Sequence, residues 1–63
     1  MRNPDPPLTT EEAELYLRVR PRTLEAMRLR RDPNSPPFVR IGRLVRYPQS
    51  LLDKWLENNI VKY

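Results

Sequence analysis

The sequence predicts a small α+β domain with the order helix, turn, helix, β-hairpin, helix. Two features lead to this expectation: prolines divide the chain into short apolar-patterned segments, and one alternating segment surrounds the single glycine, Gly42. The chain has 63 residues, which is enough for one domain that buries at most about 60% of its unfolded surface. We expect residues 1–7 to form a disordered or extended lead-in and residues 8–63 to form the domain.

The first helix is expected to begin after Thr9 and to end near Leu17. Glu12 follows Thr9 by three residues, which is the spacing of a capping box, where each side chain accepts a hydrogen bond from the other residue's backbone N–H. Ala13, Tyr16 and Leu17 stand at i, i+3 and i+4. This spacing predicts that these three side chains form the inner face of the helix.

A second helix is expected from about Pro21 to Arg31, after a turn of three or four residues. Proline suits the first turn of a helix, where its missing N–H leaves no bond unmade. Leu24 and Met27 lie on one side and predict the core face. The opposite side carries Arg22, Glu25, Ala26 and Leu29. Two short helices joined in this way form a helix-turn-helix.

Residues 38–47 are expected to form a β-hairpin around Gly42. A two-residue turn at Gly42 and Arg43 mixes apolar residues and arginines on both faces. A three-residue turn at 42–44 instead gives the pairs Ile41 with Val45, Val39 with Tyr47 and Arg40 with Arg46. Because burial of a single face specifies register strongly, we expect the three-residue turn, which gathers the apolar side chains on one face.

The remaining segments complete the expected order. Residues 32–37 contain three prolines and form a loop, and Pro48 begins the last helix, with a weaker capping box at Ser50 and Asp53 as the alternative start. The apolar stripe of this helix is Leu52, Trp55, Leu56 and Ile60. Trp55 is the expected core anchor. The order is that of a small winged helix-turn-helix, whose second helix enters the major groove of DNA while the hairpin, or wing, contacts the backbone or minor groove.

The charge is concentrated in the centre of the chain. Twelve Lys and Arg against eight Asp and Glu give a net charge of +4, and ten of the twelve cations are arginine. Residues 18–46 carry a net +7 and the other residues a net −3. Such a basic segment indicates a polyanion binder. A solvated surface is the alternative, but lysine would serve that purpose equally well, whereas the planar guanidinium suits phosphate and base recognition.

The composition argues against several other classes of protein. Without cysteine or histidine, the chain lacks thiolate ligands, the usual proton shuttle and the commonest metal ligand. We therefore expect no enzyme, with no catalytic residue, metal or cofactor. Every apolar run is far shorter than the roughly 20 residues of a membrane helix, and residues 1–7 lack the apolar stretch of a secretory signal. A cytoplasmic protein without membrane association is the expectation.

The wing provides the sharpest argument for nucleic-acid binding. In the expected register Arg40 faces Arg46, and like charges directly opposite destabilise a hairpin unless an anion such as phosphate lies between them. Arg43, beside Gly42 at the tip, suits entry into a narrow minor groove. The alternative is that edge charges only prevent aggregation between strands.

The second helix supplies the remaining candidates. Arg22 near its N-terminus suits a phosphate, Glu25 suits the amino group of cytosine, and Ala26 or Leu29 suits a thymine methyl. For Glu25, an intrahelical ion pair with a neighbouring arginine is an equally good interpretation, and the arginines that follow are either backbone clamps or solvated. The candidate DNA-binding residues are Arg20, Arg22, Thr23, Glu25, Ala26, Arg28, Leu29, Arg30, Arg40, Arg43 and Arg46.

The residues also resemble a known family. The segments concerned are 8–13 (LTTEEA), 16–19 (YLRV), 22–24 (RTL) and 38–47 (FVRIGRLVRY). They resemble the MerR-like excisionase family, which includes phage excisionases and AlpA-type prophage regulators, over roughly residues 8–57. Residues 20–28 look especially like the recognition helix of a phage excisionase. The chain departs from the family pattern at Arg18, where a glycine is common, and at Arg20, where a serine cap is usual.

The resemblance implies roles for individual residues and for the whole protein. Glu25 and Leu29 match positions that face the major groove, Arg22 matches a backbone contact, and Arg43 matches the wing-tip residue directed into the minor groove. Excisionases of this kind bind side by side near an attachment site, bend double-stranded DNA and steer a tyrosine integrase toward excision. The alternative is an AlpA-type transcriptional regulator. A less favoured class is a protein-interaction module that docks through Leu29, Leu51 or the C-terminal residues.

Overall fold

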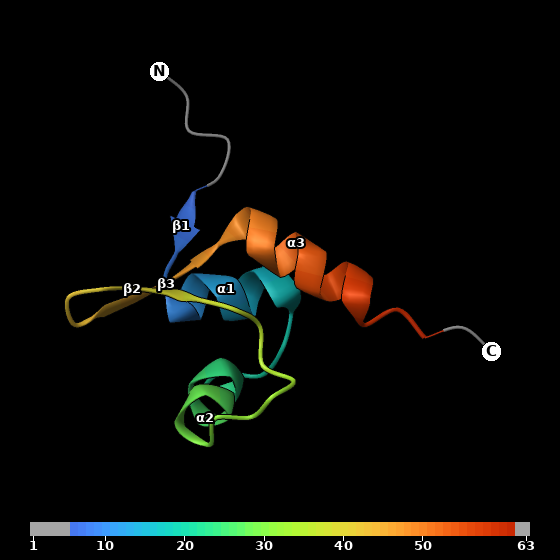
Figure 1. The fold of residues 1–63 in the computed structure, drawn as a ribbon, viewed down its shortest axis with the longest axis horizontal. Helices are drawn as coiled ribbons and strands as arrows, with labels where there is room; N and C mark the ends of the chain where they lie inside the picture. Colours follow the sequence, from blue (N-terminus) through green and yellow to red (C-terminus); the bar gives the residue numbers. More distant parts are fainter. Residues whose placement is uncertain (1–5, 62–63) are drawn as a thin grey trace.

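The computed structural model describes residues 6–61. Along the chain its elements are β1 (Pro7–Leu8), α1 (Thr10–Leu17), α2 (Thr23–Leu29), β2 (Val39–Ile41), β3 (Leu44–Pro48) and α3 (Gln49–Asn58) (Figure 1). The strands form one antiparallel sheet in the order β1-β3-β2. The hairpin β2–β3 extends away from the helices as a wing. The predicted α+β winged helix-turn-helix is confirmed.

Strand β1 is an element that the sequence analysis did not predict. Pro7 pairs with Pro48 and Leu8 with Tyr47, and the backbone N–H of Gln49 donates to the carbonyl of Pro6 at 3.3 Å. Proline is tolerated in an edge strand, because its missing N–H interrupts no inner ladder. The lead-in is therefore extended where it meets the sheet, and residues 1–5 lie outside the described residues.

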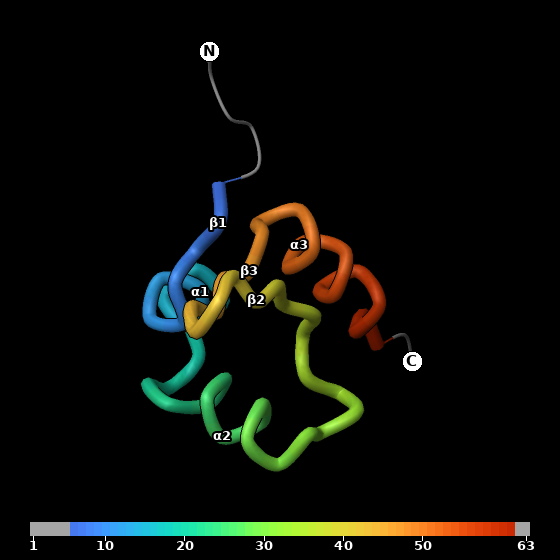
Figure 2. The backbone as a smooth tube through the Cα atoms, turned by 60° about the vertical axis from the view of Figure 1, so that its left-hand side comes forward, coloured from blue at the N-terminus to red at the C-terminus, as the bar shows by residue number. Residues whose placement is uncertain are grey.

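The core receives one fully buried side chain from each main element. Ala13 of α1, Leu24 of α2, Tyr47 of β3 and Leu52 of α3 are at most 2% exposed. The tube in Figure 2 shows these elements surrounding a common centre, with the loop between α2 and β2 closing one side. Around the core pack the partly buried Leu8, Leu17, Met27, Phe38 and Val45. Leu24 and Met27 thus lie on the inner side of α2, as predicted.

Trp55 is not the core anchor that the sequence predicted. It is half-buried, and its indole N–H donates to the carbonyl of Asn34 at 2.9 Å. Tyr47 takes the central place because β3 lies between β1 and β2 in the sheet. Trp55 instead fastens the proline-rich loop to α3.

Helix α1 begins as predicted but buries a different side chain. Both bonds of the capping box form, from the Glu12 N–H to Thr9 Oγ1 at 3.1 Å and from the Thr9 N–H to Glu12 Oε1 at 2.9 Å. Ala13 and Leu17 face the core. Tyr16 does not, since it is 42% exposed, and its hydroxyl donates to Asp53 of α3. The buried place next to Ala13 belongs to Glu14, which is only 5% exposed.

The connection between α1 and α2 is longer than predicted. Residues 18–22 separate the helices, and α2 begins at Thr23 rather than at Pro21 and ends at Leu29 rather than at Arg31. Arg22 has φ 71°, and a left-handed residue interrupts helical geometry after Pro21. Arg18, the C-cap of α1, also has a positive φ of 57°. This conformation explains why glycine suits the position that Arg18 occupies.

The register of the wing differs from the expected one. The pairs are Val39 with Arg46, Arg40 with Val45 and Ile41 with Leu44, so the turn has two residues, Gly42 and Arg43. Gly42 has φ 60°, and glycine at the first central position is typical of a type II′ turn, whose twist matches that of the strands. The wing extends beyond the core, so burial of one face does not decide its register, and turn geometry does.

The last helix follows the sequence at its start and departs from it at its end. Pro48 is the N-cap of α3, so the alternative start at Ser50 is not used. The residues of the predicted apolar stripe become less buried toward the C-terminus, since Leu56 is 43% and Ile60 65% exposed. Within residues 6–61, no helix has the length and apolar character needed to cross a membrane.

Candidate nucleic-acid interface

The outer face of α2 presents the side chains that the sequence assigned to it. Glu25 is exposed and Leu29 is 76% exposed, while Thr23 and Ala26 are half-buried. Because Leu24 is buried on the inner side, rotation of α2 is fixed and this outer face points to solvent. An exposed acid and an exposed leucine on a short helix can reach base edges in a major groove.

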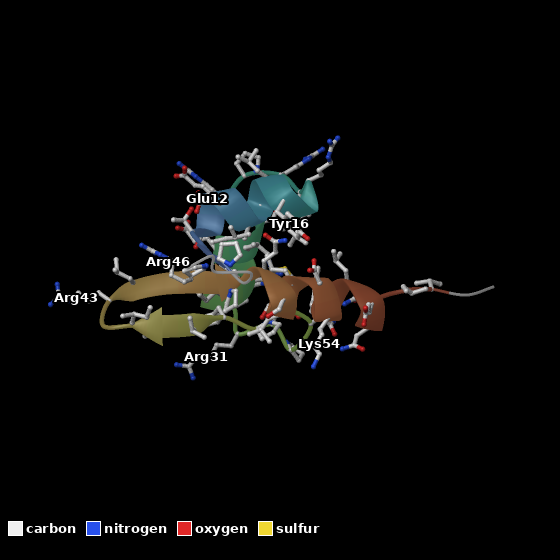
Figure 3. All side chains as sticks on the ribbon, turned by 90° about the horizontal axis from the view of Figure 1, so that it is seen from above. Glu12, Tyr16, Arg31, Arg43, Arg46 and Lys54 are labelled. Atoms are coloured by element: carbon white, nitrogen blue, oxygen red, sulfur yellow. The ribbon has the colours of Figure 1, made fainter. Side chains whose placement is uncertain are left out.

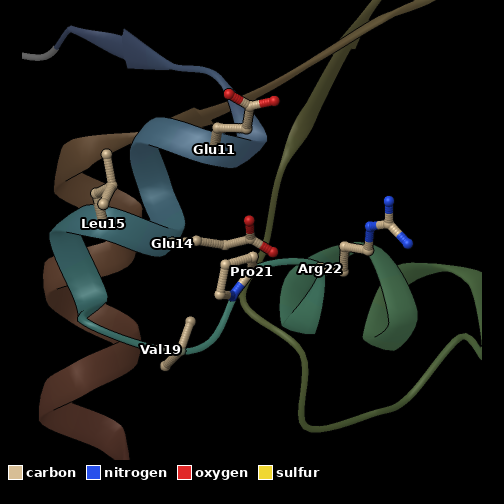
Figure 4. Close-up of a pocket in the computed structure, with 6 residues that line it drawn as sticks. All are labelled: Glu11, Glu14, Leu15, Val19, Pro21 and Arg22. Atoms are coloured by element: carbon tan, nitrogen blue, oxygen red, sulfur yellow. The ribbon is translucent and has the colours of Figure 1, made fainter.

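The N-terminus of α2 is capped from another helix. The Glu14 carboxylate of α1 accepts a hydrogen bond from the Leu24 N–H at 3.0 Å, and the N-cap residue, Arg22, makes no side-chain cap. Figure 4 shows Glu14 extending toward the start of α2 and Arg22 directed away from it. The anion at this helix end is therefore Glu14, so Arg22 lacks the free helix N-terminus that was expected to help it hold a phosphate. The sequence does carry a signal for this arrangement, because the cap position lacks the Ser, Thr, Asn or Asp that would cap the helix locally.

A cleft between the wing and the helices brings three predicted arginines together. It has a volume of about 440 Å³. Its lining residues are Thr9, Thr10, Glu11, Arg28, Arg43, Leu44, Val45 and Arg46. Since Arg28 belongs to α2 and Arg43 and Arg46 to the wing, the cleft joins the two elements that the sequence assigned to separate grooves. Three guanidinium groups against one carboxylate give it cationic character.

Arg28 is the side chain that ties these elements to each other. Its Nη1 donates to the Tyr47 hydroxyl at 3.0 Å and to Thr10 Oγ1 at 3.3 Å, and its Cζ lies 5.8 Å from the centre of the Phe38 ring. Arg28 is therefore not simply a solvated arginine, because it is hydrogen-bonded within the protein. Nε and Nη2 form no hydrogen bond within residues 6–61, so donors remain for an anion in the cleft.

The arginines of the wing do not form the expected cross-strand pair. Arg40 lies opposite Val45 and Arg46 opposite Val39, which puts the two arginines on opposite faces of the hairpin. The prediction that Arg40 and Arg46 face each other and hold a phosphate between them is therefore wrong. Figure 3 shows Arg43 at the far end of the hairpin and Arg46 on the side of α1. Arg46 is half-buried, and its Nη1 donates to the carbonyl of Val45 at 2.8 Å.

The other predicted residues lie at the ends of α2. Arg20 is exposed, and its carbonyl accepts a hydrogen bond from the Thr23 N–H at 3.2 Å. Arg30 pairs with Asp32 at 3.1 Å. Hydrogen bonds from the Asn34 N–H and then from Arg30 hold the pKa of the Asp32 carboxyl below its usual range. Arg30 is thus partly neutralised by the loop that follows it.

Glu25 keeps its carboxylate free of the neighbouring arginines. Within residues 6–61 the one ion pair is that of Arg30 with Asp32, and Arg28 is directed toward Tyr47. The intrahelical pair considered for Glu25 therefore does not form. Glu25 lies beside Glu11, Glu14 and Arg22 along a second hollow of about 270 Å³, which is an acidic counterpart to the cationic cleft.

A comparison with protein families matches residues 7–60 to a helix-turn-helix domain family. The chain belongs to this family. Comparisons with curated proteins and with solved structures give no match. Membership makes this chain a DNA-binding helix-turn-helix domain for double-stranded DNA, of a kind that is typically non-enzymatic. Within this domain α2 is the second helix of the helix-turn-helix, the position that the recognition helix has in this motif.

Proposed function

We propose that this helix-turn-helix domain is an excisionase, which binds and bends attachment-site DNA and steers a tyrosine integrase toward excision. The observation that carries the DNA-binding part is the cationic cleft between α2 and the wing. One sugar–phosphate backbone separates the major groove of a duplex from the neighbouring minor groove. A backbone lying in the cleft therefore brings α2 into one groove and the tip of the wing into the other.

In this arrangement each group of residues has a separate task. Arg28, Arg43 and Arg46 hold the phosphates of the backbone in the cleft and fix the position of the domain without reading sequence. Glu25 accepts a hydrogen bond from the amino group of a cytosine, and Leu29 contacts a thymine methyl. The net charge of +7 on residues 18–46 makes the affinity strongly dependent on salt.

The excisionase role follows from the resemblance of residues 20–28 and 38–47 to phage excisionases. A domain of this size covers one short site, so we include cooperative binding of further copies along repeated sites. The integrase supplies the strand cleavage and joining, while this domain shapes the DNA on which the integrase acts.

Two experiments test the proposal in order. A mobility-shift assay at low salt, with DNA from the genetic element that encodes the protein, is expected to give a ladder of retarded species; no retardation of any fragment would contradict DNA binding. Excision in vitro with purified integrase, with and without this protein, is expected to yield product only when both are present. Specific binding that leaves excision unchanged but represses an overlapping promoter would make the domain an AlpA-type regulator instead.

A further inference from the structure

The tip of the wing carries a pair of exposed apolar side chains. Ile41 and Leu44 lie directly opposite each other across the two-residue turn, and they are 59% and 54% exposed. Directly paired residues of an antiparallel ladder project on the same face. Val39, 38% exposed, belongs to the same face two pairs farther from the tip. Single exposed apolar residues are ordinary on a protein surface, but here a set of them covers one face of the most protruding element.

The charges around this pair indicate the chemistry of its partner. No Asp or Glu occurs between residues 33 and 52. The same stretch contains Arg43 at the tip and Arg46, which pairs with Val39 on the face of Ile41 and Leu44, whereas Arg40 projects on the other face. A surface with an apolar centre and a purely cationic rim complements an anionic ligand that has an apolar interior. The minor groove of DNA meets this description, since phosphates border walls made of sugars and stacked base edges.

We propose that Ile41 and Leu44 act as an apolar wedge that enters the minor groove below Arg43, opens a base step and thereby bends the duplex. This inference rests on the proposed function and assigns DNA bending to particular residues. Arg43 anchors the tip by charge, and the two apolar side chains take the place of part of the stacking that is lost. Wedges of leucine and isoleucine between base steps kink DNA in other minor-groove proteins.

The dimensions of the groove require such an opening. The minor groove of B-DNA is about 6 Å wide, whereas paired strands lie about 4.7–4.9 Å apart before any side-chain volume is added. The Ile41–Leu44 pair therefore fits only a widened groove. Because pyrimidine–purine steps unstack most easily, the wedge also favours TA or CA steps at the position that the wing contacts, without a hydrogen bond to any base.

The test separates binding from bending. The variant carries Ile41→Ser and Leu44→Ser, both at exposed positions, and Val39→Ser is the matched control on the same face. Arg43→Ala serves as a second comparison that removes the charge and keeps the wedge. Affinity and its salt dependence are measured by fluorescence anisotropy, and bending is measured by energy transfer between dyes at the two ends of the same attachment-site duplex.

The double variant is expected to keep the salt dependence of the wild type, because no phosphate contact is removed. It is also expected to lose most of the binding-induced change in energy transfer and to lose its preference for TA over GG steps at the wing position. Val39→Ser should bend DNA as the wild type does. Arg43→Ala should reduce the salt dependence while retained complexes still bend.

Other outcomes overturn the wedge or the proposed function separately. A double variant that bends DNA normally contradicts the wedge, and if it has lost integrase-dependent excision, the patch is a protein-docking surface. A wild type that binds without bending also contradicts the wedge while DNA binding stands. Failure of the wild-type protein to bind the duplex contradicts the proposed function itself.

Discussion

The carboxylate of Glu14 in α1 accepts a hydrogen bond from the backbone N–H of Leu24 in α2 at 3.0 Å. It thereby caps a helix whose own N-cap residue, Arg22, provides no acceptor. Glu14 is 5% exposed, so the bond is shielded from water. Because α2 has only seven residues and isolated helices of that length are unstable, its position relative to α1 depends on tertiary contacts such as this one more than on local sequence.

Glu14→Ala is expected to destabilise the domain by about 1.5–3 kcal/mol, because it removes the charged acceptor of a hydrogen bond and leaves the buried N–H of Leu24 without a partner. Glu14→Gln keeps an acceptor oxygen and should recover part of this loss. Urea unfolding followed by circular dichroism measures both. Glu11→Ala removes an exposed glutamate from the same helix and is the control; an equal loss of stability in that variant would contradict the capping role of Glu14.

Tyr47→Phe removes the hydroxyl that accepts from Arg28 at 3.0 Å, and it should lower stability by about 0.5–1.5 kcal/mol. The buried ring is retained, so the core stays filled. DNA affinity should fall as well, with an unchanged salt dependence, because Arg28 keeps its charge but loses one of the contacts that position it in the cleft. A variant with reduced stability and wild-type affinity would show that Arg28 does not contribute to DNA binding through this position.

The arginines of the wing are expected to contribute unequally. Arg43 and Arg46 line the cleft, so Arg43→Ala and Arg46→Ala should each reduce the slope of log affinity against log salt by about 1. Arg40 lies on the other face of the hairpin from Arg46, so Arg40→Ala should change the slope less. Anisotropy titrations over a series of salt concentrations give the three slopes, and equal reductions at Arg40 and Arg46 would be inconsistent with the cleft as the backbone site.

Glu25→Gln is expected to relax base preference at one position of the bound sequence. The exposed Glu25 forms no ion pair within residues 6–61, so its carboxylate is available to a cytosine amino group. Selection of bound sequences from a randomised library, carried out in parallel with the wild type, provides the comparison. The same consensus for both proteins would mean that Glu25 does not read bases.

The hydrogen bond between α1 and α3 is expected to make the stability of the fold change with pH in the alkaline range. The hydroxyl of Tyr16 donates to Asp53, and this bond raises the pKa of the phenol above its ordinary value. Since the pKa in the folded state exceeds that in the unfolded state, the contribution is complete below the unfolded value near about 10 and is lost as the pH rises through the folded value. The difference in melting temperature between wild type and Tyr16→Phe should therefore narrow above about pH 10. A constant difference from pH 8 to 11 would contradict this link.

Local patterns in the sequence were sufficient where neighbouring residues decide the structure. The capping box of Thr9 and Glu12 and the core face of Leu24 and Met27 depend on contacts within one helix or on its period, and both are as predicted. The wing was predicted as an element but not in its register. The expected register assumed that one face of the hairpin is buried, whereas the tip extends past the core and is governed by its turn.

By itself, the sequence determined the order of the elements, the concentration of arginine in the central segment and the outward face of α2, since each of these depends on residues close together in the chain. The tertiary structure decided which arginines meet. Arg28, Arg43 and Arg46 are brought to one cleft by the packing of α2 and the wing around the start of α1, while Arg40 is excluded by the register. It also decided that Glu14, a charged residue of α1, is buried. Only the approach of α2 supplies the N–H that compensates for removing its carboxylate from water.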